Sequence, residues 1–110
     1  MAGKFEVKKS KSGKFTFNLK ASNGQVILTS ESYSSHEACL NGIESVRKNA
    51  GKDANFERKV AKDGSPYFVL KASNGEIIGK SEMYSSKRTM ENGINSVKKN
   101  AMTAPVAEAK

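Results

Sequence analysis

Apolar and polar residues alternate along two short segments near the start of the chain. Residues 5–8 read Phe-Glu-Val-Lys, and residues 15–20 read Phe-Thr-Phe-Asn-Leu-Lys. A period of two is typical of a strand with one buried and one solvated face. The apolar residues 26–28 follow Asn23-Gly24, a strong hairpin signal for which we expect a type I′ turn with positive φ at both residues. These segments predict three antiparallel strands.

The pattern then changes to that of a helix. Cys39, Ile43, Val46 and Ala50 are separated by four, three and four residues, which places them on one helical face. A serine pair at residues 34–35 offers a candidate N-cap. The predicted order is therefore three strands followed by one amphipathic helix.

The same order recurs in the second half, because the sequence aligns with itself at an offset of 51 residues without a gap. Of the 46 pairs between residues 5–50 and 56–101, 26 are identical, far more than chance allows. One three-stranded sheet with one helix buries little surface, so we expect the copies to share a core. The predicted fold class is α+β, with tandem βββα repeats forming one shared antiparallel sheet and two helices on one face.

This organisation predicts a single domain. Its expected parts are repeat 1 at residues 4–52, repeat 2 at 55–102 and a flexible C-terminal tail at 103–110, all within one domain of residues 1–110.

Motifs retained in both copies resemble a known family. They are Leu-Lys-Ala-Ser-Asn-Gly at 19–24 and 70–75, Tyr-Ser-Ser at 33–35 and 84–86, and Gly-Ile-x-Ser-Val at 42–46 and 93–97. The combination is similar to the YegP-like family of uncharacterised bacterial tandem-repeat proteins, over about residues 3–102. The resemblance implies two βββα repeats in one sheet, with the extended segments after the helices exchanged between the halves. It implies no activity, catalytic residue or cofactor.

Charge adds one candidate function. The chain has 19 Lys and Arg against 11 Asp and Glu, a formal net charge of +8. The cations of the two hairpins would form one basic surface if the hairpins adjoin: Lys8, Lys9, Lys11, Lys14, Lys20, Arg58, Lys59, Lys62 and Lys71. Nucleic-acid or anion binding there would be weak and lost near physiological salt, and the aromatic residues that base recognition needs mostly face the core.

Composition also suggests a compartment. The single cysteine cannot form an internal disulfide, and the chain shows no signal peptide and no apolar run long enough for a membrane span. We expect a cytoplasmic monomer with internal pseudo-twofold symmetry and no membrane partner.

The most suggestive polar residues lie between the third strand and the helix of each copy. They are Glu31, Tyr33 and Ser35, with Glu82, Tyr84 and Ser86. Binding residues often lie in such loops, and helix N-termini attract anions. In the alternative interpretation, Tyr packs while Ser and Glu cap the helix. Retention in both copies fits either.

Other residues suggest no chemistry. His36 aligns with Lys87 and Cys39 with Met90, so we interpret them as a solvated residue and a core residue rather than as metal ligand and nucleophile. Asn-Gly at 41–42 and 92–93 is unusual inside a helix, where Gly costs about 1 kcal/mol relative to Ala. We expect the glycines to let the helix approach the sheet or the other helix; an Asn-Gly ligand site is the alternative.

The sequence therefore favours a non-enzymatic binding or interaction module of unknown partner, with no catalytic, metal or cofactor residues. A weak nucleic-acid or anion binder is the alternative, and a small-molecule enzyme is third.

Overall fold

The computed structural model describes residues 3–108. The first repeat forms β1 (Lys4–Lys9), β2 (Phe15–Lys20), β3 (Val26–Ser30) and α1 (His36–Asn49). After a short 3₁₀ helix at Asp53–Asn55, the second repeat forms β4 (Phe56–Val60), β5 (Pro66–Lys71), β6 (Ile77–Lys80) and α2 (Lys87–Ala101). A seventh strand, β7 (Val106–Glu108), follows α2.

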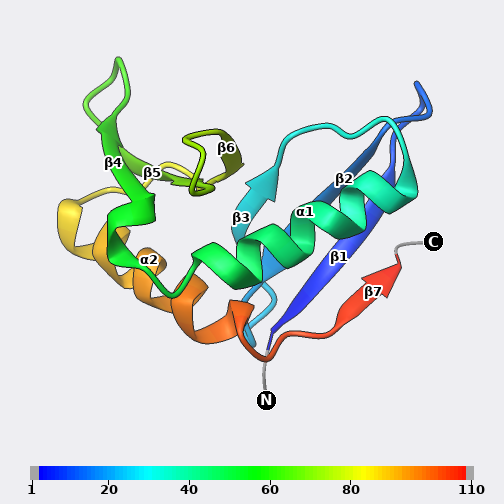
Figure 1. Cartoon of the computed structure of the whole chain (residues 1–110). Helices are drawn as coiled ribbons and strands as arrows, with labels where there is room; N and C mark the ends of the chain where they lie inside the picture. Colours follow the sequence, from blue (N-terminus) through cyan, green and yellow to red (C-terminus); the bar gives the residue numbers. More distant parts are fainter. Residues whose placement is uncertain (1–2, 109–110) are drawn as a thin grey trace.

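All seven strands belong to one sheet, in the order β4-β5-β6-β3-β2-β1-β7. The two repeats join where β3 runs antiparallel to β6, with Thr29 opposite Lys80 and Ser30 opposite Gly79. This arrangement confirms the two βββα repeats in one sheet (Figure 1). The sheet is mixed rather than wholly antiparallel, because β7 pairs with β1 in the parallel direction.

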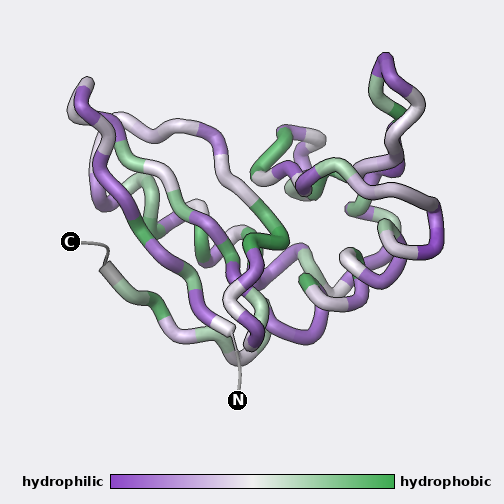
Figure 2. Tube along the Cα trace, turned by 180° about the vertical axis from the view of Figure 1, so that it is seen from behind, coloured by the Kyte–Doolittle hydropathy of each residue, from purple (hydrophilic) through white to green (hydrophobic). Residues whose placement is uncertain are grey.

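Each helix packs on strands of both repeats. Helix α1 contacts β2 of its own repeat and β5 and β6 of the other, while α2 contacts β5 together with β2 and β3. In Figure 1, α1 lies in front of the β1–β2 hairpin. The predicted apolar stripe of α1 is fully buried and belongs to one core cluster with the equivalent residues of α2. Figure 2 shows hydrophilic and hydrophobic residues alternating along the β1–β2 hairpin, as a one-sided sheet requires.

The β2–β3 hairpin forms as predicted, but its turn is of another type. Gly24 has a φ of 86°, whereas Asn23 is not among the residues with positive φ. The Gly24 N–H donates to the Ala21 carbonyl at 2.9 Å, and the Asn23 side-chain oxygen accepts from the Gln25 N–H at 3.0 Å. The side-chain hydrogen bond stabilises Asn23 in an ordinary conformation, so only the glycine needs the left-handed one.

The sequence predicts a flexible tail over residues 103–110, but the structure places a strand within it. The Phe5 N–H donates to the Pro105 carbonyl at 2.8 Å, and Arg47 Nη2 donates to the Ala104 carbonyl at 2.6 Å. Ala104 is buried in the core. Single-sequence patterns miss this strand because β1 and α1 supply its hydrogen bonds. Residues 109–110 lie outside the described residues.

Candidate functional site

The two loop tyrosines pack against their own helices. The Tyr33 ring stacks on Phe17 with 6.3 Å between centroids, and a Cβ built on Gly42 would lie 2.6 Å from Tyr33 Cζ. The same arrangement holds for Tyr84 on Phe68, at 6.2 Å, and for Gly93, again 2.6 Å from Cζ. The helical glycines therefore make room for the phenol rings. The expected approach to the sheet holds only at Gly93, where an added Cβ would also lie 3.3 Å from Phe68 Cε2.

The loop serines are helix caps. Ser35 Oγ accepts from the Ala38 N–H at 3.0 Å. Ser86 Oγ accepts from the Thr89 N–H at 3.2 Å, and Thr89 Oγ1 in turn accepts from the Ser86 N–H. Both serines satisfy N–H groups that the first helical turn leaves without a partner. Glu31 and Glu82 are solvent-exposed and take no part in the caps.

His36 and Cys39 lie in different surroundings, His36 exposed and Cys39 buried. The His36 ring meets the edge of Phe15 with 5.6 Å between centroids. Cys39 is fully buried in the core, as its place on the apolar stripe predicts. Within residues 3–108, the structure brings together no group of three His, Cys, Asp or Glu side chains that could hold a metal ion.

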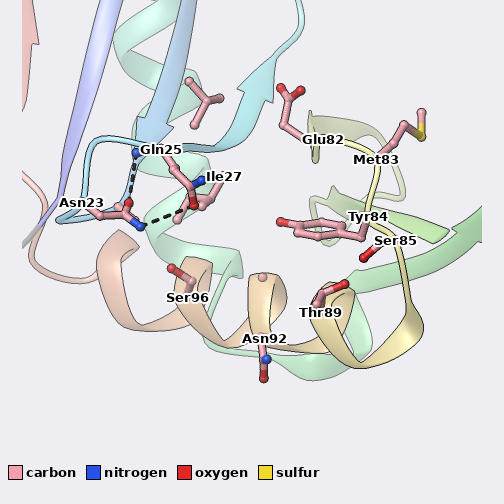
Figure 3. A pocket seen from close by; sticks show the side chains of 13 residues that line it. Asn23, Gln25, Ile27, Glu82, Met83, Tyr84, Ser85, Thr89, Asn92 and Ser96 are labelled. Atoms are coloured by element: carbon pink, nitrogen blue, oxygen red, sulfur yellow. Dashed lines mark hydrogen bonds between the residues drawn. The ribbon is translucent and has the colours of Figure 1, made fainter. Parts of the chain in front are cut away.

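A groove of about 870 Å³ lies between the β2–β3 turn and α2. Figure 3 shows the Tyr84 hydroxyl pointing toward the middle of this groove, with Glu82 and Met83 above it. One wall comes from the turn of the first repeat, and the other from the loop and helix of the second. Its lining residues are Ala21, Asn23, Gln25, Val26, Ile27, Glu82, Met83, Tyr84, Ser85, Thr89, Asn92, Gly93 and Ser96.

A second hollow of about 500 Å³ continues along α2 and shares Ala21, Asn23 and Ser96 with the first. The residues of α2 that line the two hollows follow helical spacing, and Thr103 lies just after the helix: Thr89, Asn92, Gly93, Ser96, Lys99, Asn100 and Thr103. We define these two connected hollows as the α2 groove.

The larger hollow combines polar and apolar residues and is nearly uncharged. Hydroxyl groups of Ser85 and Ser96 and the amide groups of Asn23 and Gln25 line it, and Glu82 is its one charged residue. Partial burial, and to a lesser degree the Glu82 carboxylate, raise the pKa of Tyr84. The phenol is therefore protonated at neutral pH and can donate a hydrogen bond.

The α2 groove brings together two of the six candidate residues, Glu82 and Tyr84, and Ser86 is not among its lining residues. The sequence analysis missed the other wall, because the β2–β3 turn is far from α2 in the chain. A signal was available on the helix, where Thr89, Asn92 and Ser96 repeat at spacings of three and four.

The expected basic surface is arranged differently from the prediction. The hairpins β1–β2 and β4–β5 do not adjoin, because β3 and β6 lie between them. Arg58 turns to the helix side, where it pairs with Asp53 and Glu91, and Lys9 lies over the Phe15 ring. Four of the predicted cations, Lys8, Lys20, Lys59 and Lys71, instead lie on the sheet face opposite the helices, as the strand register requires.

The sequence matches a family model described as "Domain of unknown function (DUF1508)" twice, over residues 10–57 and 61–108. A UPF0339 protein of Mannheimia succiniciproducens is 55% identical over 106 residues, which cover 96% of this chain and 94% of that protein. A UPF0339 protein of Pseudomonas aeruginosa is 52% identical, with 90% of each chain covered.

Two solution structures are similar to the whole fold. The protein of unknown function YegP from E. coli has a TM-score of 0.93 at 47% identity, covering 98% of this chain and 93% of that one. A UPF0339 protein from Shewanella oneidensis has a TM-score of 0.92 at 48% identity, covering 98% and 92%.

The chain belongs to the DUF1508 family, in agreement with the resemblance drawn from its repeated motifs. The first matched unit ends at the start of β4, and the second ends with β7. Strand β7, which follows α2, pairs with β1 of the first repeat, and β4, which follows α1, pairs with β5 of the second repeat. None of the helices within residues 3–108 has the length and apolar character needed to cross a membrane.

Proposed function

We propose that the chain is a non-enzymatic binding module and that the α2 groove receives an uncharged, extended segment of a protein partner. The observation that supports this most directly is the lining of the larger hollow. Only one of its 13 residues is charged, in a chain in which 27% of residues are charged. The Glu82 carboxylate is the one charge that a ligand would meet there, and it would repel an anion and attract a cation.

The same lining argues against catalysis. General acid–base chemistry is most effective with a group whose pKa lies near the working pH. The larger hollow offers one carboxylate, on Glu82, and one phenol, on Tyr84, whose pKa is raised. A nucleophile with an adjacent base is not among its lining residues.

An extended polypeptide matches the groups that are present. Its backbone presents N–H donors and carbonyl acceptors in alternation, and the hydroxyl and amide groups of the groove can pair with both. Val26 and Ile27 supply apolar contact within the groove. Met83 is 48% exposed, and its flexible side chain can adapt to different side chains of a partner. Binding by hydrogen bonds along a backbone is a common mode of peptide recognition.

Affinity capture from a native cell extract tests this proposal, with nuclease added so that nucleic acid does not bridge. Ser96→Arg fills the α2 groove with a long charged side chain. Ser45→Arg is the matched control, because Ser45 is the equivalent residue of α1 and both serines accept from the side-chain amide of an asparagine one turn on.

We expect wild type and Ser45→Arg to retain the same protein and Ser96→Arg to lose it, with unchanged thermal unfolding in all three. Capture of the same protein by all three variants, or its equal loss from both, would overturn the assignment to this groove. A further check is Tyr84→Phe against Tyr33→Phe, which removes one hydroxyl inside the groove and one outside its lining.

A further inference from the structure

One face of the sheet carries no helix, and its residues follow from the strand register. Directly paired residues form a row across six strands: Glu6, Asn18, Thr29, Lys80, Val69 and Glu57. Alternate residues of a strand share a face, so the neighbours two positions away belong to the same surface. We call this surface the open face.

Lysines dominate the charges of the open face. The cations among its described residues are Lys4, Lys8, Lys20, Lys59, Lys71 and Lys80. Two carboxylates, Glu6 and Glu57, lie among them, which leaves a formal charge of +4 from six positive and two negative groups. Half of the net charge of the whole chain is therefore concentrated on this one face.

The lysines form two equivalent clusters, one in each repeat. Glu6 lies 2.9 Å from Lys20 Nζ and 3.8 Å from Lys4 and Lys8. Glu57 lies 2.7 Å from Lys71 Nζ and 3.8 Å from Lys59. At the offset of 51 residues, Glu6 is equivalent to Glu57, Lys8 to Lys59 and Lys20 to Lys71.

Between the clusters stands Lys80, with its Nζ 5.1 Å from the centre of the Tyr67 ring. The row from Glu6 to Glu57 crosses five strand-to-strand steps of about 4.8 Å, or roughly 24 Å. Lysines of the open face lie on five of these six strands, all except β3, so that a chain of phosphates crossing the sheet can contact both clusters.

We propose that the open face binds the sugar-phosphate backbone of single-stranded nucleic acid without sequence preference. This proposal is independent of the α2 groove, which lies beside the other face of the sheet. Lysine ammonium groups pair with phosphates as point charges and do not fix base identity.

The form of the face favours a single strand over a duplex. Both helices pack on the opposite face, so neither can enter a groove of a duplex from this side. A flexible single strand can follow a twisted sheet. Tyr67, half-buried under Lys80, is the one aromatic residue in the part of this face that the structure describes. One base can stack there, whereas a series of aromatic residues would be needed to hold several bases.

The two carboxylates set the strength of this binding. Hydrogen bonds from Lys20 and Lys71 lower the pKa of Glu6 and Glu57, so both are ionised at neutral pH and compete with phosphate for the lysines. Removing their charge should strengthen binding. A surface that only kept the protein soluble would show no such dependence on position.

Fluorescence anisotropy with a labelled single-stranded oligonucleotide of mixed sequence tests the proposal, at about 20 mM and about 150 mM salt. Lys20→Gln with Lys71→Gln removes one lysine from each cluster. The matched control is Lys48→Gln with Lys87→Gln, which removes the same charge from the two helices.

At low salt we expect the open-face variant to bind roughly tenfold more weakly than wild type, and the slope of log affinity against log salt to shrink by about 1.4, or about 0.7 for each lost phosphate contact. The helix variant should stay within about twofold of wild type, because its charges lie away from the bound strand. Glu6→Gln with Glu57→Gln should tighten binding and extend it to higher salt.

Equal weakening by the two lysine variants would overturn the proposal, since net charge alone would then explain binding. Three other results would also overturn the proposal. They are an unchanged affinity of the glutamate variant, tighter binding of a duplex of the same length, and binding of anionic vesicles without binding of the oligonucleotide.

Discussion

Replacing Gly42 by Ala should destabilise the protein, although Ala is the better helix former by about 1 kcal/mol. The added Cβ would lie 2.6 Å from Tyr33 Cζ and 3.0 Å from Cε2, well inside van der Waals contact. The ring must therefore move. Displacement from its stacked position on Phe17 loses about 0.5–1.5 kcal/mol, and a strained rotamer costs about as much again. The net loss of unfolding free energy should be about 1 kcal/mol.

The sign of this effect should reverse when the ring is absent. All three of the heavy atoms nearest to the added Cβ belong to Tyr33. In a Tyr33→Ala background, Gly42→Ala should therefore stabilise the protein by up to about 1 kcal/mol through helix propensity alone. The coupling between the two positions is then about 2 kcal/mol, within the range seen for residues in contact.

Urea denaturation of the wild type, both single variants and the double variant measures this cycle, with thermal unfolding as a second readout. A change of 1 kcal/mol corresponds to roughly 4 °C for a domain of this size. The equivalent pair, Gly93 and Tyr84, provides a graded comparison. There the added Cβ also lies 3.3 Å from Phe68, so removing Tyr84 should recover less of the helix propensity. If Gly42→Ala has the same effect with and without Tyr33, the glycine is not retained to accommodate the phenol.

Three further predictions concern the attachment of β7, the ion pairs of Asp53 and the dependence of one repeat on the other. Arg47→Met should speed hydrogen exchange at the Phe5 amide, measured by NMR, because the arginine holds the chain that leads into β7; unchanged protection would show that it is not the anchor. Hydrogen bonds from Arg58, and then from Lys98, lower the pKa of Asp53 from 3.8 to about 2, so the stability they provide is present above about pH 4 and is lost as the pH falls toward 2; Asp53→Asn should flatten that part of a urea-midpoint profile against pH. Residues 1–52 alone should be unfolded or dimeric in sedimentation and NMR, because α1 packs on strands of both repeats; a stably folded monomer would contradict a shared core.

Local patterns were enough to predict the elements, and the duplication was enough to predict how they combine. Alternation located the strands of each hairpin, and the stripe from Cys39 to Ala50 located the buried face of α1. The strand β7 could not be predicted in this way. Its hydrogen bonds come from residues about 100 positions earlier in the chain, and three residues carry too short a pattern to indicate a strand.

The candidate site was predictable only in part, for a related reason. Tyr33 and Tyr84 stood out because both copies retain them, yet retention alone does not separate a packing role from a binding role. The distinction depends on the opposite wall of the α2 groove, which the β2–β3 turn supplies across the boundary between repeats. A motif search within one repeat cannot find a surface that two repeats build together.

The two copies of the repeat differ in sequence at the two ends of the sheet. Beyond β1 lies β7, whereas no strand lies beyond β4 among the described residues. At the covered end, Val7 and Ala104 are buried, and Leu40 packs against the core. Their counterparts at the uncovered end, at an offset of 51 residues, are charged: Arg58, Asp53 and Glu91.

Arg58 pairs with both carboxylates, with Nε 2.7 Å from Glu91 and Nη2 3.1 Å from Asp53. A covering strand excludes water and favours apolar residues, while an edge left open to solvent tolerates an ion-paired group and is protected by it from pairing with another chain. The chain termini explain why the ends differ. The segment after α1 leads through the 3₁₀ helix into β4, which pairs beside β5. The equivalent place beside β2 is already filled by β1. The segment after α2 therefore runs outside β1 as β7. The duplicated sequence has thus diverged where the two ends of the sheet demand different chemistry, and it has kept its motifs where they do not.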